Sequence, residues 1–232
     1  MLFRSNVVMG LFAHANVAMS DTTAWSFTAF NASSPAWTKK AGPAMQDTAY
    51  SSSSATFTAV PVNNTATSDI VIVCATGITY TGVTIGGNAM TLVVGSTGLS
   101  IWKYTGTIFT TPNIVVTAGG AIPFTGITVG VLSNINPAQT DTAIKAVGFD
   151  PNPQVATSTL DIPVGGFGIV AYQQGAIGAI TPNNITQDYS LSLAATATDT
   201  MLWSGYMTTS GVPSLDGAAY VGSILVSAAW GP

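Results

Sequence analysis

From residue 26 onward the chain alternates short runs rich in Val, Ile, Thr and aromatic residues with clusters of Gly, Pro, Asn and Ser. Such runs, bounded by turn-forming residues at short intervals, are typical of strands in an all-β protein. The pattern predicts an antiparallel β-sandwich, of jelly-roll or immunoglobulin-like type. We expect strands near 26–30, 55–60, 69–75, 83–85, 89–94, 99–104, 113–118, 126–133, 142–148, 159–162, 167–173, 189–193, 201–207 and 219–228.

Two segments carry the clearest local signals. Gly86 and Gly87 lie between alternating arms over 83–92 and predict a tight hairpin turn, because glycine adopts positive φ at little cost. The run 219–228 has an apolar centre, as expected of a strand covered on both faces. No internal repeat is evident, so we expect one sandwich domain over residues 21–232, preceded by an N-terminal arm of residues 1–20.

The N-terminal arm has apolar residues at helical spacing, although a strand fits the same residues. Arg4 followed by an apolar run is similar to the start of a secretory signal, but polar residues interrupt it. The run is too short and too polar for a membrane span, which needs about 20 consecutive apolar residues. We expect the arm to dock on a neighbouring subunit through Val8, Leu11 and Phe12.

Charge is scarce throughout the chain. Charged residues make up 6% of the sequence, there is no Glu, and the formal net charge is −4. A typical soluble domain carries about 25% charged residues, so this surface is expected to consist largely of hydroxyl and amide groups. Five cations are too few to neutralise a run of phosphates, which argues against nucleic-acid binding.

The sequence lacks the residues that most catalytic mechanisms require. His14 is the only histidine and lies in the apolar arm, and no Gly-x-Ser-x-Gly motif positions a serine nucleophile. One His and one Cys cannot build a zinc site. Cys74 lies in the apolar run Ile70–Ala75, which predicts a buried, unreactive thiol.

Carboxylates are the remaining candidates for chemistry. The nine aspartates fall mostly at predicted strand ends or turns, where Asp hydrogen-bonds the local backbone, and this favours capping over a catalytic pair. Calcium ligation by Asp150 with Asn152, or by Asn134, Asn136 and Asp141, is the alternative to turn chemistry. We assign no catalytic, cofactor-binding or metal-ligating residue and expect no enzymatic activity.

Aromatic residues leave a second function open. In a chain with so little charge, most large aromatics are expected in the core or in subunit contacts. Exposed Trp and Tyr also stack on sugar rings. If the protein binds glycans, the stacking residues are expected among Trp37, Trp102 and Trp203.

Five motifs follow one another along the chain: Ile70–Ala75, Thr84–Leu92, Ile101–Tyr104, Asn113–Thr117 and Gly130–Asn136. Their order resembles that of β-sandwich structural proteins of tailed-bacteriophage virions and related bacterial surface modules. The resemblance covers about residues 65–142, and departs from the family pattern over Asn134–Asp141, where Asn stands in place of the usual Gly. It implies a virion or surface module and transfers no catalytic residue.

These observations lead to one expected function and one alternative. We expect a non-enzymatic virion structural protein, a capsid decoration or cement protein or a tail-associated protein, that binds other virion proteins and itself. It would need no cofactor and would assemble into the virion in the bacterial host cytoplasm. The alternative is a glycan-binding receptor-recognition module of a phage tail tip or a bacterial adhesin, acting at the extracellular surface on a host glycan.

Overall fold

The computed structural model describes residues 36–46, 52–62, 70–108, 111–147, 154–156, 158–175, 180–193, 200–217 and 223–232. These residues form strands and turns, with no helix among them. None of the described segments therefore offers a helix able to cross a membrane. Contacts group Ser33–Pro232 into one compact unit. The expected arm, with Val8, Leu11 and Phe12, and the expected strand at 26–30 lie outside the described residues.

The strands fall into two consecutive sets. The first set is β1 (Ala36–Gln46), β2 (Ser54–Phe57), β3 (Ile70–Thr76), β4 (Tyr80–Ile85), β5 (Asn88–Ala89), β6 (Thr91–Ser96), β7 (Leu99–Thr105), β8 (Ile114–Ala118) and β9 (Thr125–Ser133). The second set is β10 (Gln139–Val147), β11 (Gln154–Ala156), β12 (Phe167–Gln174), β13 (Ile180–Asn183), β14 (Thr186–Leu193), β15 (Thr200–Met207), β16 (Ser214–Gly217) and β17 (Ser223–Trp230).

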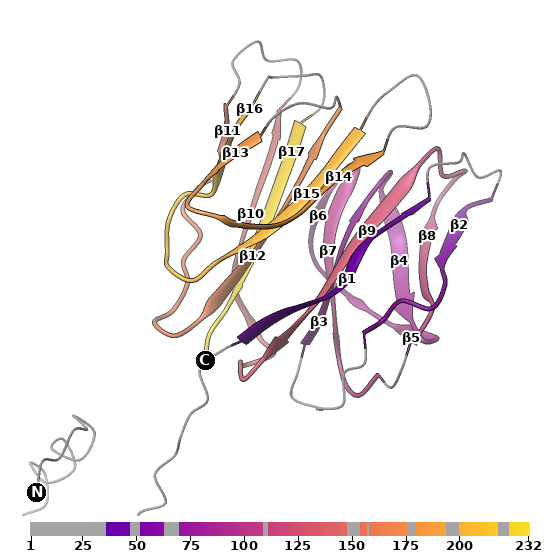
Figure 1. Cartoon of the computed structure of the whole chain (residues 1–232), viewed down its shortest axis with the longest axis horizontal. Helices are drawn as coiled ribbons and strands as arrows, with labels where there is room; N and C mark the ends of the chain where they lie inside the picture. Colours follow the sequence, from indigo (N-terminus) through magenta and orange to yellow (C-terminus); the bar gives the residue numbers. More distant parts are fainter. Residues whose placement is uncertain are drawn as a thin grey trace, which may run out of the picture. The chain divides into compact units, whose positions relative to one another are not determined.

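Each set folds into its own β-sandwich (Figure 1). In the N-terminal sandwich, a five-stranded sheet of order β1-β9-β3-β7-β6 faces a four-stranded sheet of order β2-β8-β4-β5. In the C-terminal sandwich, a five-stranded sheet of order β10-β17-β12-β15-β14 faces a three-stranded sheet of order β11-β16-β13. All described strand pairs are antiparallel.

The N-terminal sandwich has jelly-roll topology. The chain passes back and forth between the two sheets, so that β1, β3, β6, β7 and β9 lie in one and β2, β4, β5 and β8 in the other. The segment from β5 to β6 passes from one sheet to the other at Met90, whose backbone N–H donates to Val83 O at 2.8 Å. Eight strands wound in this way, counting β5 and β6 as one, make the jelly roll. The expected all-β sandwich is thus confirmed.

The C-terminal sandwich repeats this topology strand for strand. Replacing β1, β2, β3, β4, β6, β7, β8 and β9 by β10 to β17 in order converts the first sheet orders into the second, apart from β5. Individual residues also correspond. Trp102 pairs with Val73 and Trp203 with Tyr172, at matching positions. The expected single sandwich over 21–232 is therefore replaced by two jelly rolls within one compact unit.

A matching backbone contact supports the duplication. Val60 N donates to Pro112 O at 2.9 Å in the N-terminal sandwich, and Leu160 N donates to Gly211 O at 2.8 Å in the C-terminal one. Both donors are buried residues of the segment that follows the second strand. The fold is thus duplicated in its loops as well as in its sheets.

The two sandwiches pack through their five-stranded sheets. Strand β6 lies against β10, and β1 against β14, so each contact has its counterpart when the two halves are exchanged. Two copies that use the same face on each other form a twofold, isologous contact. The buried residues between these sheets are Ile70, Ile72, Cys74, Val93, Val94, Leu99, Ile101, Leu132, Ile135, Phe167, Ile169, Ala171, Leu202, Ile224, Val226, Ala228 and Trp230.

The connection between the sandwiches is held at several points. Ile135 is buried between the five-stranded sheets. The backbone N–H of Asn136 donates to Gly231 O at 3.0 Å, which ties the connection to the C-terminal end of the chain. Lys103 Nζ donates to Pro137 O at 2.7 Å. These bonds fix the linker to both halves.

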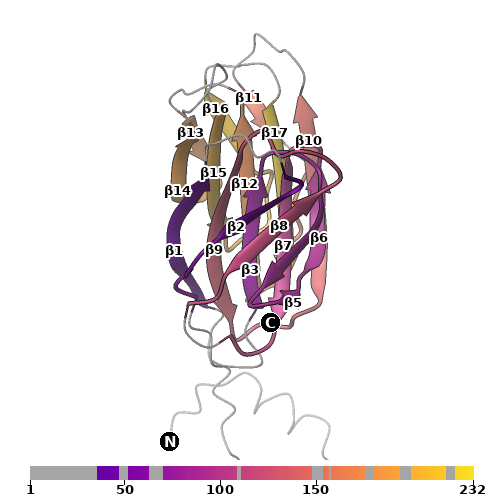
Figure 2. The same cartoon turned by 90° about the vertical axis from the view of Figure 1, so that its right-hand side faces the viewer.

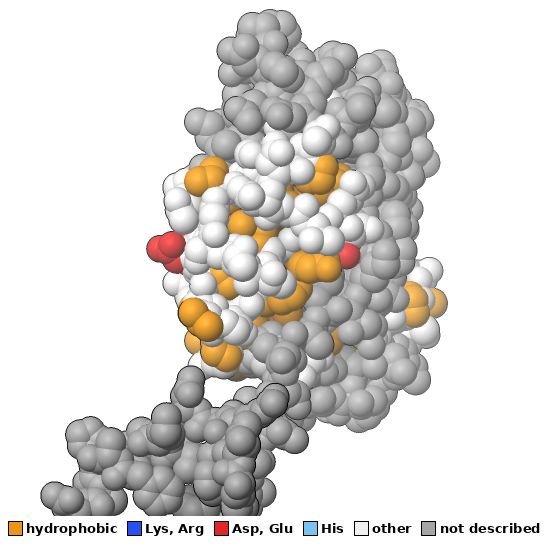
Figure 3. Space-filling model, turned by 60° about the vertical axis from the view of Figure 1, so that its left-hand side comes forward, with side chains coloured by type: hydrophobic (Ala, Val, Ile, Leu, Met, Phe, Trp, Pro, Cys, Tyr) orange, Lys and Arg blue, Asp and Glu red, His pale blue; other side chains and the backbone are white. Residues whose placement is uncertain are grey.

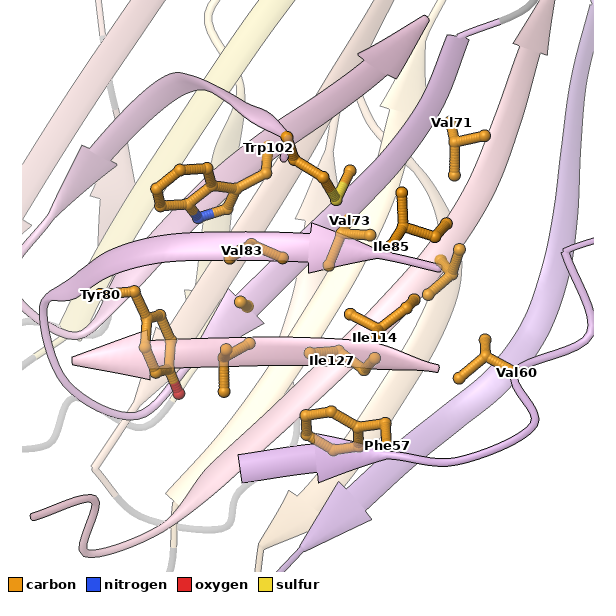
Figure 4. Packing of buried hydrophobic residues seen from close by; sticks show 14 of the residues in the cluster. Phe57, Val60, Val71, Val73, Tyr80, Val83, Ile85, Trp102, Ile114 and Ile127 are labelled. Atoms are coloured by element: carbon orange, nitrogen blue, oxygen red, sulfur yellow. The ribbon is translucent and has the colours of Figure 1, made fainter. Parts of the chain in front are cut away.

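Mainly aliphatic side chains fill the N-terminal sandwich, together with Phe57, Tyr80 and Trp102 (Figure 4). At one end Tyr80 hydrogen-bonds with Thr76 O at 2.7 Å and Thr125 Oγ1 at 2.5 Å. A side chain at Gly77 would meet Phe124 O at 2.4 Å, so this close approach requires glycine. The buried phenol of β4 therefore has polar partners on β3 and β9 of the facing sheet.

Strand predictions from the sequence succeed where β-branched runs are long. The Gly86-Gly87 turn is confirmed by φ values of 55° and 82°, and β17 is buried along its full length. In place of the expected strand at 159–162 there is one bridge, from Leu160 to Gly211. Strands β1, β11, β13 and β16 were not predicted.

The shared interface predicts that the two sandwiches unfold together. Leu202→Ala, at a fully buried interface position, is expected to lower the free energy of unfolding by about 2–5 kcal/mol. Val164→Ala, at a side chain that is 99% exposed, is the control, with an expected change within about 0.5 kcal/mol. Urea unfolding followed through the indole N–H resonances of Trp102 and Trp203 reports on each sandwich separately. Coincident transitions are expected, and two separate transitions would refute a shared cooperative core.

Candidate functional site

Two of the three tryptophans proposed for glycan stacking are buried. Trp102 lies inside the N-terminal sandwich and Trp203 inside the C-terminal sandwich. The expectation that either stacks on an exposed sugar is wrong, because each faces the smaller sheet of its own jelly roll. Trp37 lies on β1, and its side chain is outside the described residues.

Asp141 binds backbone N–H groups, one of them in the next residue, as turn chemistry predicts. Asp141 accepts hydrogen bonds from Thr142 N and Asp161 N, both at 2.8 Å. Asn136 Oδ1 accepts from Ala138 N at 2.9 Å, and Asn134 has φ of 58°, in the left-handed region. Within the described part of the chain, no three His, Cys, Asp or Glu residues gather into a metal-binding group. His14, Asp150 and Asn152 lie outside it.

Cys74 is a core residue, as its apolar run predicts. It lies between the two five-stranded sheets. Burial raises the pKa of its thiol to about 12, and a hydrogen bond with the Thr128 side chain opposes this shift only in part. A thiol kept protonated and away from solvent is a poor nucleophile. Cys74 therefore contributes packing and no chemistry.

The sheet edges are the places where the described residues offer contacts to another molecule. Figure 2 shows β1 and β14 along one side of the paired sandwiches, and β6 and β10 along the other. An edge strand exposes unpaired backbone N–H and C=O groups, and proteins commonly protect such edges with charge, proline or short length. Three of the four long edges carry protecting residues: Lys39, Lys40 and Pro43 on β1, Asp141 and Lys145 on β10, and Asp188 on β14.

Strand β6 is the long edge that lacks these residues. Its sequence, Thr-Leu-Val-Val-Gly-Ser, has no charge and no proline. A register shift between Leu92 and Val94 on the side paired with β7 is its one irregularity. The edges of the smaller sheets, β2, β5, β11 and β13, are two to four residues long. Strand β6 is therefore the best-formed docking edge among the described strands.

Exposed apolar side chains accompany this edge. Leu92 on β6 and Ile144 on the adjacent β10 are each 49% exposed. Both strands border the same side of the paired sandwiches. An exposed Leu beside an exposed Ile on neighbouring edges provides apolar area next to unpaired backbone groups. We define Thr91–Ser96 together with Ile144 as the β6 edge surface.

A second apolar point is the turn Pro163–Gly166. Gly166 N donates to Pro163 O at 2.7 Å, and Gly165 has φ of 78°, which a type II turn requires at its third position. A side chain at Gly166 would meet Trp230 O at 2.4 Å, so the turn is pressed against the last strand. It presents Val164 fully to solvent. Figure 3 shows a face of mainly uncharged and hydrophobic atoms with isolated acidic side chains.

Comparisons with known proteins do not add to this assignment. No protein-family model, curated protein or solved structure matches the chain.

Buried titrating groups predict a loss of stability in alkali. Burial raises the pKa of Tyr80, like that of Cys74, to about 12. Both groups release protons more readily in the unfolded chain. Their contribution to the free energy of unfolding is therefore complete below pH 9 and is lost as the pH rises toward 12. The titration of each group lowers the free energy of unfolding by at most about 1.4 kcal/mol per pH unit. Urea unfolding between pH 8 and 11 should show this decline.

The Cys74→Ala variant separates the two contributions. It is expected to be less stable than the parent at neutral pH and to lose stability less steeply between pH 9 and 10, where Tyr80 barely titrates in the unfolded chain. An unchanged slope in this variant would show that the Cys74 thiol does not titrate as its burial requires.

Proposed function

We propose that the protein is a non-enzymatic virion structural protein, a capsid decoration or cement protein or a tail-associated protein, that works through subunit contacts. Jelly rolls occur in viral capsid proteins and in lectins, so the topology supports both the virion and the glycan hypotheses. The burial of Trp102 and Trp203 removes two of the three proposed stacking residues. The balance therefore favours assembly over glycan recognition.

Low charge supports an assembled state. The chain has 6% charged residues and a formal net charge of −4. A free domain relies on surface charge to remain dispersed in solution. A subunit whose edges are covered by neighbours needs less charge, because the area that faces solvent is smaller. Neutral Thr and Ser surfaces are compatible with such an assembled state.

The observation that carries the proposal is the β6 edge surface. It combines an unprotected edge strand with Leu92 and Ile144, each half exposed. Such an edge is suited to β-augmentation, in which a strand of another molecule extends the sheet. We propose that the occupant is a strand of a neighbouring virion subunit, with a second copy of this chain as the first case. Residues 1–20 are the proposed docking arm.

Charge placed on β6 should prevent this contact. Leu92→Lys is expected to weaken self-association at least tenfold, about 1.4 kcal/mol, because an unpaired charge would be buried in the contact. Thr117→Lys adds the same charge to the exposed outer face of β8, away from any edge, and is the matched control. Native mass spectrometry and light scattering of the full chain measure the assembly.

The outcomes separate clearly. Assembly of the parent and of Thr117→Lys, with dissociation of Leu92→Lys at unchanged thermal stability, supports the proposal. A parent chain that stays monomeric at all concentrations would contradict self-assembly, and equal assembly of all three proteins would exclude the β6 edge.

A further inference from the structure

Strand β6 contains a bulge that changes which of its residues share a face. In the register with β7, Leu92 is opposite Trp102 and Gly95 is opposite Ser100, and Val93 is the extra residue. Residues two apart on a strand point to the same face, so the two partners on β7 share a face. Leu92 and Gly95 therefore share a face as well, although they are three residues apart.

A contact within the strand agrees with this arrangement. A Cβ atom placed on Gly95 would lie 3.3 Å from Leu92 Cδ1 and 3.1 Å from Ser100 Cβ. The Leu92 side chain thus reaches over Gly95. Both residues belong to the face of the sheet on which Trp102 is buried inside the N-terminal sandwich.

The other residues of β6 belong to the opposite face. Val93 and Val94 are buried between the two five-stranded sheets. Ser96 is opposite Leu99, which is buried in the same place, and Thr91 lies on this face by the same register. Strand β6 therefore has two residues on one face and four on the other.

Leu92 and Gly95 also direct their backbone groups away from β7. Residues 97–98 form a two-residue turn between Ser96 and Leu99, and the pair that closes such a turn is hydrogen-bonded. Hydrogen-bonded and non-hydrogen-bonded pairs alternate along an antiparallel ladder. Gly95 therefore directs its N–H and C=O outward, and Leu92, on the same face, does the same.

These outward groups lie at an open edge of the sheet. Among the described strands, β6 has a neighbour on one side only, which is β7 (Figure 2). The N–H and C=O groups of Leu92 and Gly95 can therefore bond to a strand of another molecule. The spacing of these two residues decides which strand fits.

An antiparallel second copy of β6 offers a matching set of residues. When all six residues of the two strands are paired, Leu92 of one copy is opposite Gly95 of the other, and both belong to the same face. In a regular strand, residues three apart point to opposite faces, so this register exists because of the bulge. The remaining pairs also join residues of one face, and they are Val93 with Val94 and Thr91 with Ser96.

Backbone hydrogen bonds follow from the same register. Opposed residues of a hydrogen-bonded pair exchange both N–H···O=C bonds. Leu92 and Gly95 are the outward residues of each copy, so both Leu92–Gly95 pairs exchange their bonds. The glycine also leaves space beside the leucine that it faces.

The absence of charge on β6 fits a contact between identical strands. In a twofold contact the same surface is used by both copies, and like charges on opposed strands repel. Strand β6 has no charged residue. Charges lie on the other three long edges, at Lys39 and Lys40 of β1, Asp141 and Lys145 of β10, and Asp188 of β14. Of the four, β6 alone pairs with its own copy without placing a charge in the contact.

We propose that β6 pairs with β6 of a second copy of this chain, in antiparallel orientation, about a twofold axis between Val93 and Val94. The two sheets of order β1-β9-β3-β7-β6 then join into one continuous sheet with β1 at both ends. This inference rests on the proposed function, because it names the strand that occupies the β6 edge surface. A twofold contact is closed, so it leaves the β1 edge for other virion proteins.

Cysteine substitutions in the full chain test the register. Thr91 is exposed and Ser96 is partly exposed. The proposal places them opposite each other as a non-hydrogen-bonded pair, with Cα atoms about 4.5 Å apart, which a disulfide can span. Thr91→Cys and Ser96→Cys chains are mixed and treated with oxidised glutathione, and cross-linked peptides are identified by mass spectrometry. Cys74 is buried and does not take part.

The mixture is expected to form a disulfide between the two chains. Neither variant alone is expected to cross-link, because the two copies of residue 91 would lie about 15 Å apart. Ser96→Cys mixed with Thr117→Cys, on the exposed outer face of β8, is the matched control. Cross-linking in the control is expected to be at least about tenfold slower, since its cysteines do not come within disulfide range. Thermal unfolding verifies that each variant is folded.

The other outcomes overturn the proposal in distinguishable ways. Cross-linking of Thr91→Cys with itself would show that the two strands are parallel. If the parent assembles and Leu92→Lys dissociates, but the mixture does not cross-link, the β6 contact stands and its occupant is a different strand, such as one from residues 1–20. A parent chain that stays monomeric overturns both the pairing and the self-assembly on which it rests.

Discussion

The structure depends on the burial of two apolar sheet faces against each other. Strands β3, β12 and β17 are buried along their whole length, because each five-stranded sheet has its own smaller sheet on one side and the other sandwich on the opposite side. A single sandwich would expose one of these faces to water, and each Å² of exposed apolar surface would cost about 25 cal/mol of folding free energy. This explains why the central strands read as continuous apolar runs and lack the alternation of a half-exposed sheet.

The two halves differ away from this interface. When two copies of a fold share one core, the sandwich interiors and the sheet edges that lie away from that core are free to differ. The N-terminal half has an apolar interior with satisfied polar groups, such as the bond from Trp102 to Ser100. The C-terminal half has the buried residues Tyr172, Gln174 and Ser227 where the strand register places Val73, Ala75 and Val131 in the N-terminal half. The edges differ in the same manner: β1, β10 and β14 carry charged residues, and β6 does not.

Local chemistry in the sequence predicted local structure well. The β-branched run at Ile70–Ala75, the Gly86-Gly87 turn and the buried Cys74 all follow from residue type and spacing. The duplication could not be predicted from the sequence, because the matched residues of the two halves are mostly different. Strand order is also set by pairing across long sequence separations. Strand β1, with Lys39, Lys40 and Pro43, lacks a β-type pattern and forms by pairing with β9. The burial of Trp102 and Trp203 depends on which sheet covers each face, which periodicity does not specify.

We propose that the two fused jelly rolls bind a neighbouring subunit through β6, the long edge without charge or proline among the described strands. Amide hydrogen exchange, compared between the assembled and the dissociated full chain, tests this most directly. The account predicts slower exchange on assembly for the outward amides of β6 and unchanged exchange for those of β14. Exchange in β6 that is the same in both states, with protection appearing elsewhere, would contradict it.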